Sequence, residues 1–145
     1  EKFDLILGSP PYFPVGGGHE GVHPQTVACR FELRGNISDY CEVASEHLAS
    51  GGFFSCIFPI QPEHQRERVE QAAKEAGLTI IRKRSIVFKE GDAPLLSLFG
   101  MMKSTDLPEN FRNQTWEEPP LTIRSKDGTV HSEYSAIKLS IGFPP

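Results

Sequence analysis

The sequence has no long apolar run. None of its hydrophobic stretches approaches the roughly 20 residues that a transmembrane helix needs, and no basic segment followed by an apolar one opens the chain. It starts at Glu1-Lys2-Phe3-Asp4 without an initiator methionine, which is typical of a chain cut from a longer one. We therefore expect a protein without membrane segments that is part of something larger.

Cysteine is scarce. The three cysteines, Cys29, Cys41 and Cys56, are an odd number at wide spacing, which argues against a disulfide framework and favours a reduced, cytoplasmic setting. Cys41 and Cys56 lie in apolar patterns and are predicted to be inert core residues. Zinc binding by His19, His23 and Cys29 would need a paired ligand motif that the sequence lacks, so we expect no metal site.

The chain has no excess of basic charge. Its net charge of −4 gives no general attraction to a polyanion, which counts against a stand-alone nucleic-acid binder. The net charge of −4 is still compatible with an enzyme whose basic surface lies on another segment. The cluster Arg82-Lys83-Arg84 could contact RNA phosphates, but the interpretation we favour is a solvated strand edge.

Apolar strand patterns alternate with helical ones over residues 1–103. This alternation predicts an α/β fold with a parallel sheet covered on both faces, and a short turn at 90–94 makes the last two strands antiparallel. The predicted strands are 3–8, 52–60, 78–81 with 86–88, and 95–102. The predicted helices are 27–33, one from Asn36 or Ser38 that Gly51-Gly52 stops, and one from Pro62 to Ala76.

Residues 104–145 are predicted to be a tail extension that packs on the same domain. Residues 104–120 are polar and rich in proline, and a turn at 126–128 suggests a small hairpin-like appendage over 121–134. Trp116 either packs this tail on the sheet, which we favour, or presents an aromatic surface.

The sequence Ser9-Pro10-Pro11-Tyr12 directly follows the first predicted strand. Ligands of α/β proteins bind at the carboxyl ends of parallel strands. Two consecutive prolines fix the backbone and remove two N–H donors, so the turn offers mainly acceptors: the Ser9 hydroxyl and the carbonyls of Ser9 and Pro10. Tyr12 adds a flat ring, and stacking contributes about 1–3 kcal/mol per nucleic-acid base. The alternative interpretation is an ordinary turn without a functional role. If the turn is functional, its acceptor groups and the Tyr12 ring match a planar amine substrate.

Gly16-Gly17-Gly18 lies in the segment that follows this turn. It lacks the strand-to-helix context and the lysine of a phosphate-binding P-loop. We interpret it as part of a flexible substrate loop.

The turn and its strand resemble the Asn/Asp/Ser-Pro-Pro-aromatic motif of class I S-adenosylmethionine-dependent amino-methyltransferases. That family, with a Rossmann-like fold, acts on adenine N6, cytosine N4, guanine N2 or a glutamine amide. Further segments are similar to the bacterial methyltransferases of adenine N6 in a valine tRNA: Ala28–Glu32, Gly51–Phe54, Glu90–Leu96, Pro120–Ile123 and Glu133-Tyr134. The resemblance covers essentially the whole chain, but only the carboxyl-terminal half of the family.

The resemblance implies a catalytic set formed by Ser9, Pro10, Pro11 and Tyr12. In it, Ser9 and the Pro10 carbonyl hold the target amine, and Tyr12 stacks on the base with Phe13 beside it. Arg30 is implied as a substrate contact, and Ser9 as a neighbour of the cofactor S-adenosylmethionine. The family usually has asparagine at the Ser9 position. Its glycine-rich cofactor loop and acidic ribose ligand do not occur in these residues.

We therefore expect methyl transfer to an exocyclic amine, with adenine N6 of tRNA as the favoured acceptor and RNA as the partner. Catalysis would be mostly positional, since the sulfonium methyl is already activated. The fragment alone should be inactive, and its open sheet edge should pair with the missing amino-terminal half or with a second copy. The alternatives are another acceptor (an rRNA guanine or a release-factor glutamine) and a non-catalytic binding module derived from a methyltransferase.

Overall fold

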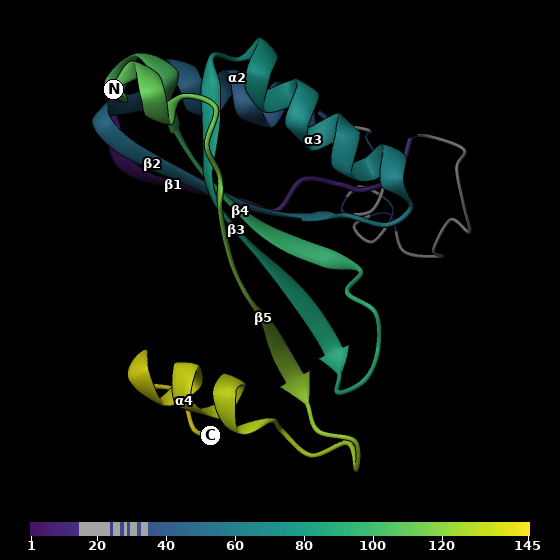
Figure 1. The fold of residues 1–145 in the computed structure, drawn as a ribbon. Coiled ribbons are helices and arrows are strands. Elements are labelled where there is room, and N and C mark those ends of the chain that lie inside the picture. The colour runs from purple at the N-terminus through teal and green to yellow at the C-terminus, as the bar shows by residue number, and fades with distance from the viewer. Residues whose placement is uncertain (15–23, 25–26, 28, 30–31, 33–34) are drawn as a thin grey trace.

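The computed structural model describes residues 1–14, 24, 27, 29, 32 and 35–145 (Figure 1). The longer elements are β1 (Phe3–Gly8), α2 (Ile37–His47), β2 (Leu48–Pro59), α3 (Glu63–Glu75), β3 (Leu78–Lys89), β4 (Leu96–Lys103), β5 (Trp116–Arg124) and α4 (Ser132–Ser140). Two short 3-10 turns, Ser104–Asp106 and Glu109–Phe111, lie between β4 and β5. The predicted helix 27–33 falls largely outside the described residues.

The described strands form one sheet in the order β1-β2-β4-β3-β5. β1 is parallel to β2 and β3 is parallel to β5, whereas β4 runs antiparallel to both of its neighbours. This arrangement confirms the predicted α/β class and the antiparallel final pair. β1 forms one edge of the described sheet.

α2 and α3 pack against each other on one face of the sheet (Figure 1). The apolar stripes of both helices meet the even-numbered residues of β2 and residues of β4 in one core, which contains Ile37, Cys41, Ala44, Val69, Ala72, Ala73, Phe54, Cys56, Phe58, Phe99 and Met101. The odd-numbered positions 53, 55 and 57 of β2 are only partly buried. Coverage of both faces, as the sequence suggested, is therefore wrong for this part of the described sheet.

β2 begins earlier than predicted. Leu48 is fully buried and pairs with Phe3, and the register then shifts before Leu5 pairs with Phe53. Gly51, with φ of 72°, lies within this irregular stretch, where a left-handed residue suits a bulge. The prediction that Gly51-Gly52 stops the preceding helix is wrong, since α2 already ends at His47.

β3 is a continuous inner strand between β4 and β5, so the predicted solvated edge is wrong. The Arg82 guanidinium pairs with Glu118 at 2.7 Å, and the Lys83 ammonium lies 3.4 Å from a Glu117 carboxylate oxygen. Trp116 remains 61% exposed, with the Arg82 guanidinium 5.3 Å from its ring centroid. The favoured interpretation of Trp116 as a packing residue is therefore also wrong.

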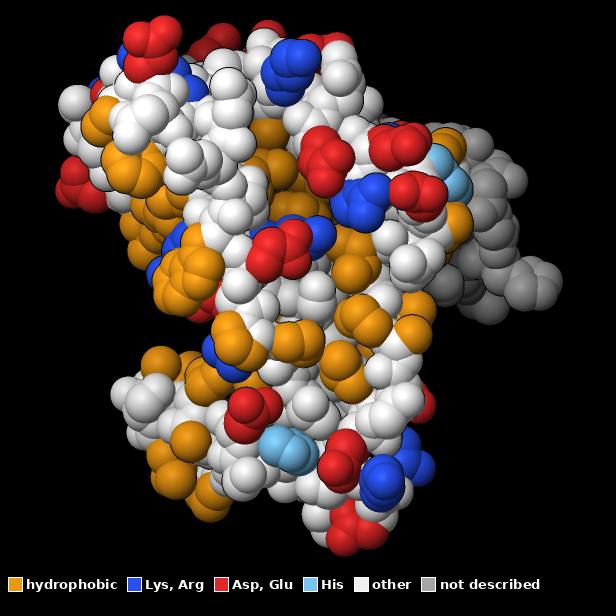
Figure 2. Space-filling view, viewed as in Figure 1, with side chains coloured by type: hydrophobic (Ala, Val, Ile, Leu, Met, Phe, Trp, Pro, Cys, Tyr) orange, Lys and Arg blue, Asp and Glu red, His pale blue; other side chains and the backbone are white. Residues whose placement is uncertain are grey.

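In the tail the predicted turn is present, but the prediction of a hairpin around it is wrong. Arg124 and Val130 form an isolated antiparallel bridge around the turn, but α4 then begins at Ser132. α4 packs on β5 and lies far from α2 and α3 (Figure 1). Figure 2 shows apolar side chains at the surface around α4 and a hollow between α4 and the body of the molecule. No helix within the described ranges has the length and apolar character that a membrane crossing requires.

Candidate functional site

The site begins where β1 ends against α2. A methyl group placed on Gly8 would lie 3.1 Å from Cδ1 of Tyr40 and 3.1 Å from Cε2 of Phe54. These contacts are tight, so glycine lets the strand end come close to the helix and to β2. The following turn therefore leaves the sheet directly from the edge of the packed core.

The two prolines of the turn are anchored, and the serine is displayed. Pro10 and Pro11 are buried, whereas Ser9 is exposed and Tyr12 is partly buried. Because proline fixes its own φ, burial of two successive rings makes this a rigid corner. Of the predicted acceptor residues, Ser9 thus lies at the surface of the described structure, whereas Pro10 is buried.

The Tyr12 ring packs on the core from the same corner. It meets the Phe58 ring edge-to-face, with centroids 5.7 Å apart and an interplanar angle of 85°, and Phe13 lies 6.4 Å from it. The pKa of the Tyr12 phenol is raised above its usual value, chiefly by burial; a hydrogen bond with the Ser9 side chain opposes this shift and the Cys56 thiol adds to it. The phenol therefore stays neutral at physiological pH, and the structure brings the Ser9 and Tyr12 side chains together.

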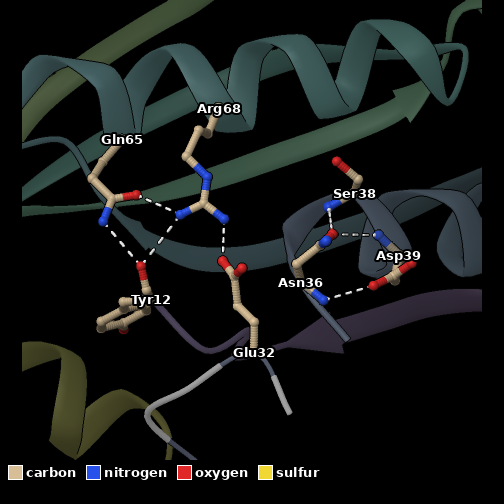
Figure 3. Close-up of polar contacts among 7 residues, drawn as sticks. All are labelled: Tyr12, Glu32, Asn36, Ser38, Asp39, Gln65 and Arg68. Atoms are coloured by element: carbon tan, nitrogen blue, oxygen red, sulfur yellow. Dashed lines mark hydrogen bonds and ion pairs between the residues drawn. The ribbon is translucent and has the colours of Figure 1, made fainter. Parts of the chain in front are cut away.

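The backbone carbonyl of Tyr12 is held by α3, a contact that sequence patterns did not predict. It accepts a hydrogen bond of 2.9 Å from Nε2 of Gln65 and one of 3.3 Å from a guanidinium nitrogen of Arg68 (Figure 3). Gln65 stands one turn before Val69 on the apolar stripe of α3 and is 3% exposed. A polar residue on such a stripe is the signal that could have revealed this contact, because buried amides need partners.

Part of the predicted site lies outside the described residues. This applies to Arg30 and to Gly16-Gly17-Gly18; His19 and His23, at which no metal site was expected, also lie outside them. Glu32 is described: its carboxylate pairs with Arg68, and its backbone N–H donates to the Phe13 carbonyl at 3.0 Å. The chain segments at Phe13 and Glu32 are thus joined beside the corner.

The fit of a methyl-donor cofactor can be tested on the strand end itself. Residues 8–14 carry no charged side chain and supply one aliphatic hydroxyl, one phenol and backbone carbonyls. Such a set can orient an amine, but it provides no carboxylate for the hydroxyls of a ribose. At this strand end the chain therefore offers an acceptor corner and not a complete cofactor site.

Comparison with known proteins gives partial matches to methyltransferases. The chain is 39% identical over 62 residues to the type II methyltransferase M.CvrRI of Paramecium bursaria Chlorella virus XZ-6E, covering 41% of this chain and 15% of the relative. It is 32% identical over 93 residues to the tRNA1(Val) (adenine(37)-N6)-methyltransferase of Pasteurella multocida, covering 64% and 36%. It is 25% identical over 136 residues to the protein of that name from Histophilus somni, covering 94% and 51%. No protein-family model matches the sequence.

A solved structure shares the fold. A predicted O-methyltransferase from Agrobacterium tumefaciens superposes with a TM-score of 0.63 at 17% identity, covering 98% of this chain and 52% of that structure. The chain thus spans about half the length, or less, of the proteins that it matches. The sheet is Rossmann-like, as predicted, and the curated proteins that the chain resembles are methyltransferases, in agreement with the resemblance noted in the sequence.

Proposed function

We propose that the whole protein transfers a methyl group from S-adenosylmethionine to an exocyclic amino nitrogen, and that this nitrogen is adenine N6 of a tRNA. The observation that carries the proposal is the rigid corner at the end of β1, where buried prolines hold an exposed Ser9 beside the Tyr12 ring. Similarity to two tRNA adenine-N6 methyltransferases supports the acceptor.

The residues of this chain would act by binding and orienting the amine. S-adenosylmethionine supplies an activated methyl group when it is bound. The Ser9 hydroxyl and the Pro10 carbonyl would accept hydrogen bonds from the amine, and the Tyr12 ring would stack on the base. Orientation of this kind lowers the barrier without a general base, because the nitrogen loses its proton to water after it has become cationic.

The cofactor site would be completed by the rest of the protein. Leu5 and Leu7 of the edge strand β1 are 58% and 73% exposed, and such an apolar edge favours pairing. We propose that the remaining part of the methyltransferase domain, or else a second copy, covers it. Residues 1–103 would then be the second half of that domain and 104–145 its extension, as the pairing of β5 with β3 suggests.

The test is methyl transfer by the whole protein. Purified protein, labelled S-adenosylmethionine and tRNA are incubated, and the tRNA is digested to nucleosides for mass analysis. We expect N6-methyladenosine. Tyr12→Ala should lower the rate about 5- to 150-fold, since stacking contributes about 1–3 kcal/mol, whereas Tyr12→Phe keeps the ring and most of the rate.

The controls separate the parts of this proposal. Thermal unfolding of both variants reports whether the fold survives the change. Label on guanine or on a protein glutamine would mean that the acceptor is wrong. An unchanged rate in Tyr12→Ala would show that Tyr12 does not bind the base.

A further inference from the structure

Two side chains of α3 form a closed set of hydrogen bonds with the backbone of Tyr12 (Figure 3). The Gln65 amide donates to the Tyr12 carbonyl at 2.9 Å, and the Arg68 guanidinium reaches the same oxygen at 3.3 Å. Arg68 also donates to Oε1 of Gln65 at 2.9 Å. Each member of this set therefore fixes the other two, which makes the Tyr12 backbone position depend on α3.

The guanidinium of Arg68 holds two further groups. Its second terminal nitrogen pairs with the Glu32 carboxylate, and its carbon lies 5.6 Å from the centroid of the Phe58 ring. Phe58 is the edge-to-face partner of the Tyr12 ring. The Arg68 guanidinium thus lies over the Phe58 ring, against which the Tyr12 ring packs, and it also donates to the Tyr12 carbonyl. Both the side chain and the backbone of Tyr12 are therefore held through Arg68.

The contacts are specific to arginine at this position. A planar guanidinium can donate to the carbonyl, the amide and the carboxylate at once because its five N–H groups point in fixed directions. A lysine ammonium carries charge but has no such fork. The neighbouring Arg66 instead pairs with two residues of its own helix, Glu63 at 2.7 Å and Glu70 at 3.6 Å, and so serves as a matched control.

We propose that Gln65 and Arg68 are positioning residues that hold Tyr12 for the incoming base. The inference rests on the proposed function, and it adds two residues that do not themselves touch the substrate. Loss of Arg68 frees the Tyr12 carbonyl and ring to shift, and a displacement of about 1 Å at a reacting centre costs up to about 100-fold in rate.

The kinetic test compares Arg68→Gln with Arg66→Gln in the whole protein. Arg68→Gln is expected to lower kcat about 10- to 100-fold with little change in KM for S-adenosylmethionine, and Arg66→Gln to leave both unchanged. Arg68→Lys should recover only part of the loss. In a Tyr12→Ala background, Arg68→Gln should have little further effect, because its action passes through Tyr12. Equal losses in the two backgrounds would overturn the proposal.

A second measurement does not depend on activity. The protein is labelled with 3-fluorotyrosine, and the fluorine NMR signal of Tyr12 is assigned by its disappearance in Tyr12→Phe. Arg68→Gln and Gln65→Leu are expected to shift or broaden that signal, whereas Arg66→Gln leaves it in place. An unshifted signal in Arg68→Gln and Gln65→Leu overturns the positioning role even if the enzyme is active. Absent methyl transfer by the unmodified protein, with shifted signals, refutes the proposed function and leaves the positioning role standing.

Discussion

Gly100 lies in β4 at a point where any side chain would meet the ring of Phe53. A methyl group placed there would be 2.4 Å from Cζ and 3.0 Å from Cε2 of that ring. Carbon atoms in contact prefer about 3.5–4.0 Å, so the ring would have to move by roughly 1 Å. β4 cannot retreat easily, because Gly100 pairs with Ser55 on one side and Arg82 on the other.

The expected loss of stability is the difference between two opposing effects. Overpacking costs about 1–3 kcal/mol, whereas replacing glycine by alanine stabilises by up to about 1 kcal/mol through the unfolded chain. Gly100→Ala is therefore expected to lower the free energy of unfolding by about 1–2 kcal/mol. Phe53→Ala removes the obstructing ring, and in that background Gly100→Ala should be neutral or stabilising.

The assay is urea denaturation of the unmodified protein, both single variants and the double variant. A coupling free energy of about 2 kcal/mol between the two positions is expected from this clash. If Gly100→Ala has the same effect with and without the Phe53 ring, the close approach of β4 to Phe53 is not what makes glycine necessary there.

Two further predictions concern α2 and the buried thiols. Asn36 accepts hydrogen bonds from two backbone N–H groups in the first turn of α2, at 2.8 and 3.2 Å. In urea denaturation, Asn36→Ala should therefore lower the free energy of unfolding by about 1 kcal/mol and Asn36→Asp by much less. Equal losses in the two variants would contradict the capping role of Asn36. Burial raises the pKa of the Cys41 and Cys56 thiols from 9.0 to about 12. The contribution of each neutral thiol to the free energy of unfolding is therefore fully present below pH 9 and is lost as the pH rises towards 12. In a Cys29→Ser background, iodoacetamide should therefore label neither thiol at pH 8 until urea unfolds the protein, and rapid labelling of the folded protein would count against their burial.

The corner itself could be predicted because its determinants are local. Two adjacent prolines after an apolar strand specify a rigid turn at a strand end, and in the structure this turn follows β1 with Ser9 exposed and Pro10 buried. The hydrogen bonds from Gln65 and Arg68 could not be predicted in this way. They join residues that lie 53 and 56 positions from Tyr12, and only the packing of α3 against β2 brings these together.

In the tail, residues 104–145, the sequence predicts the turn but not the helix that follows it. The turn at 126–128 is predicted correctly from its lysine, aspartate and glycine, and Asp127 caps it through Thr129. The residues after this turn could form strand or helix on local preference alone. α4 begins at Ser132 because the His131 ring accepts a hydrogen bond from the Glu133 N–H, and Glu133 reaches back toward the Thr122 N–H on β5.

The Ser9–Tyr12 corner is proposed to receive the amine. An experimental structure of the whole protein with a non-reactive S-adenosylmethionine analogue and an RNA that contains the target adenine would show where the base binds. We predict adenine N6 within hydrogen-bond distance of the Ser9 hydroxyl and the Pro10 carbonyl, with the base against the Tyr12 ring. A base bound elsewhere, with this corner covered by another part of the protein, would show that the corner does not receive the amine.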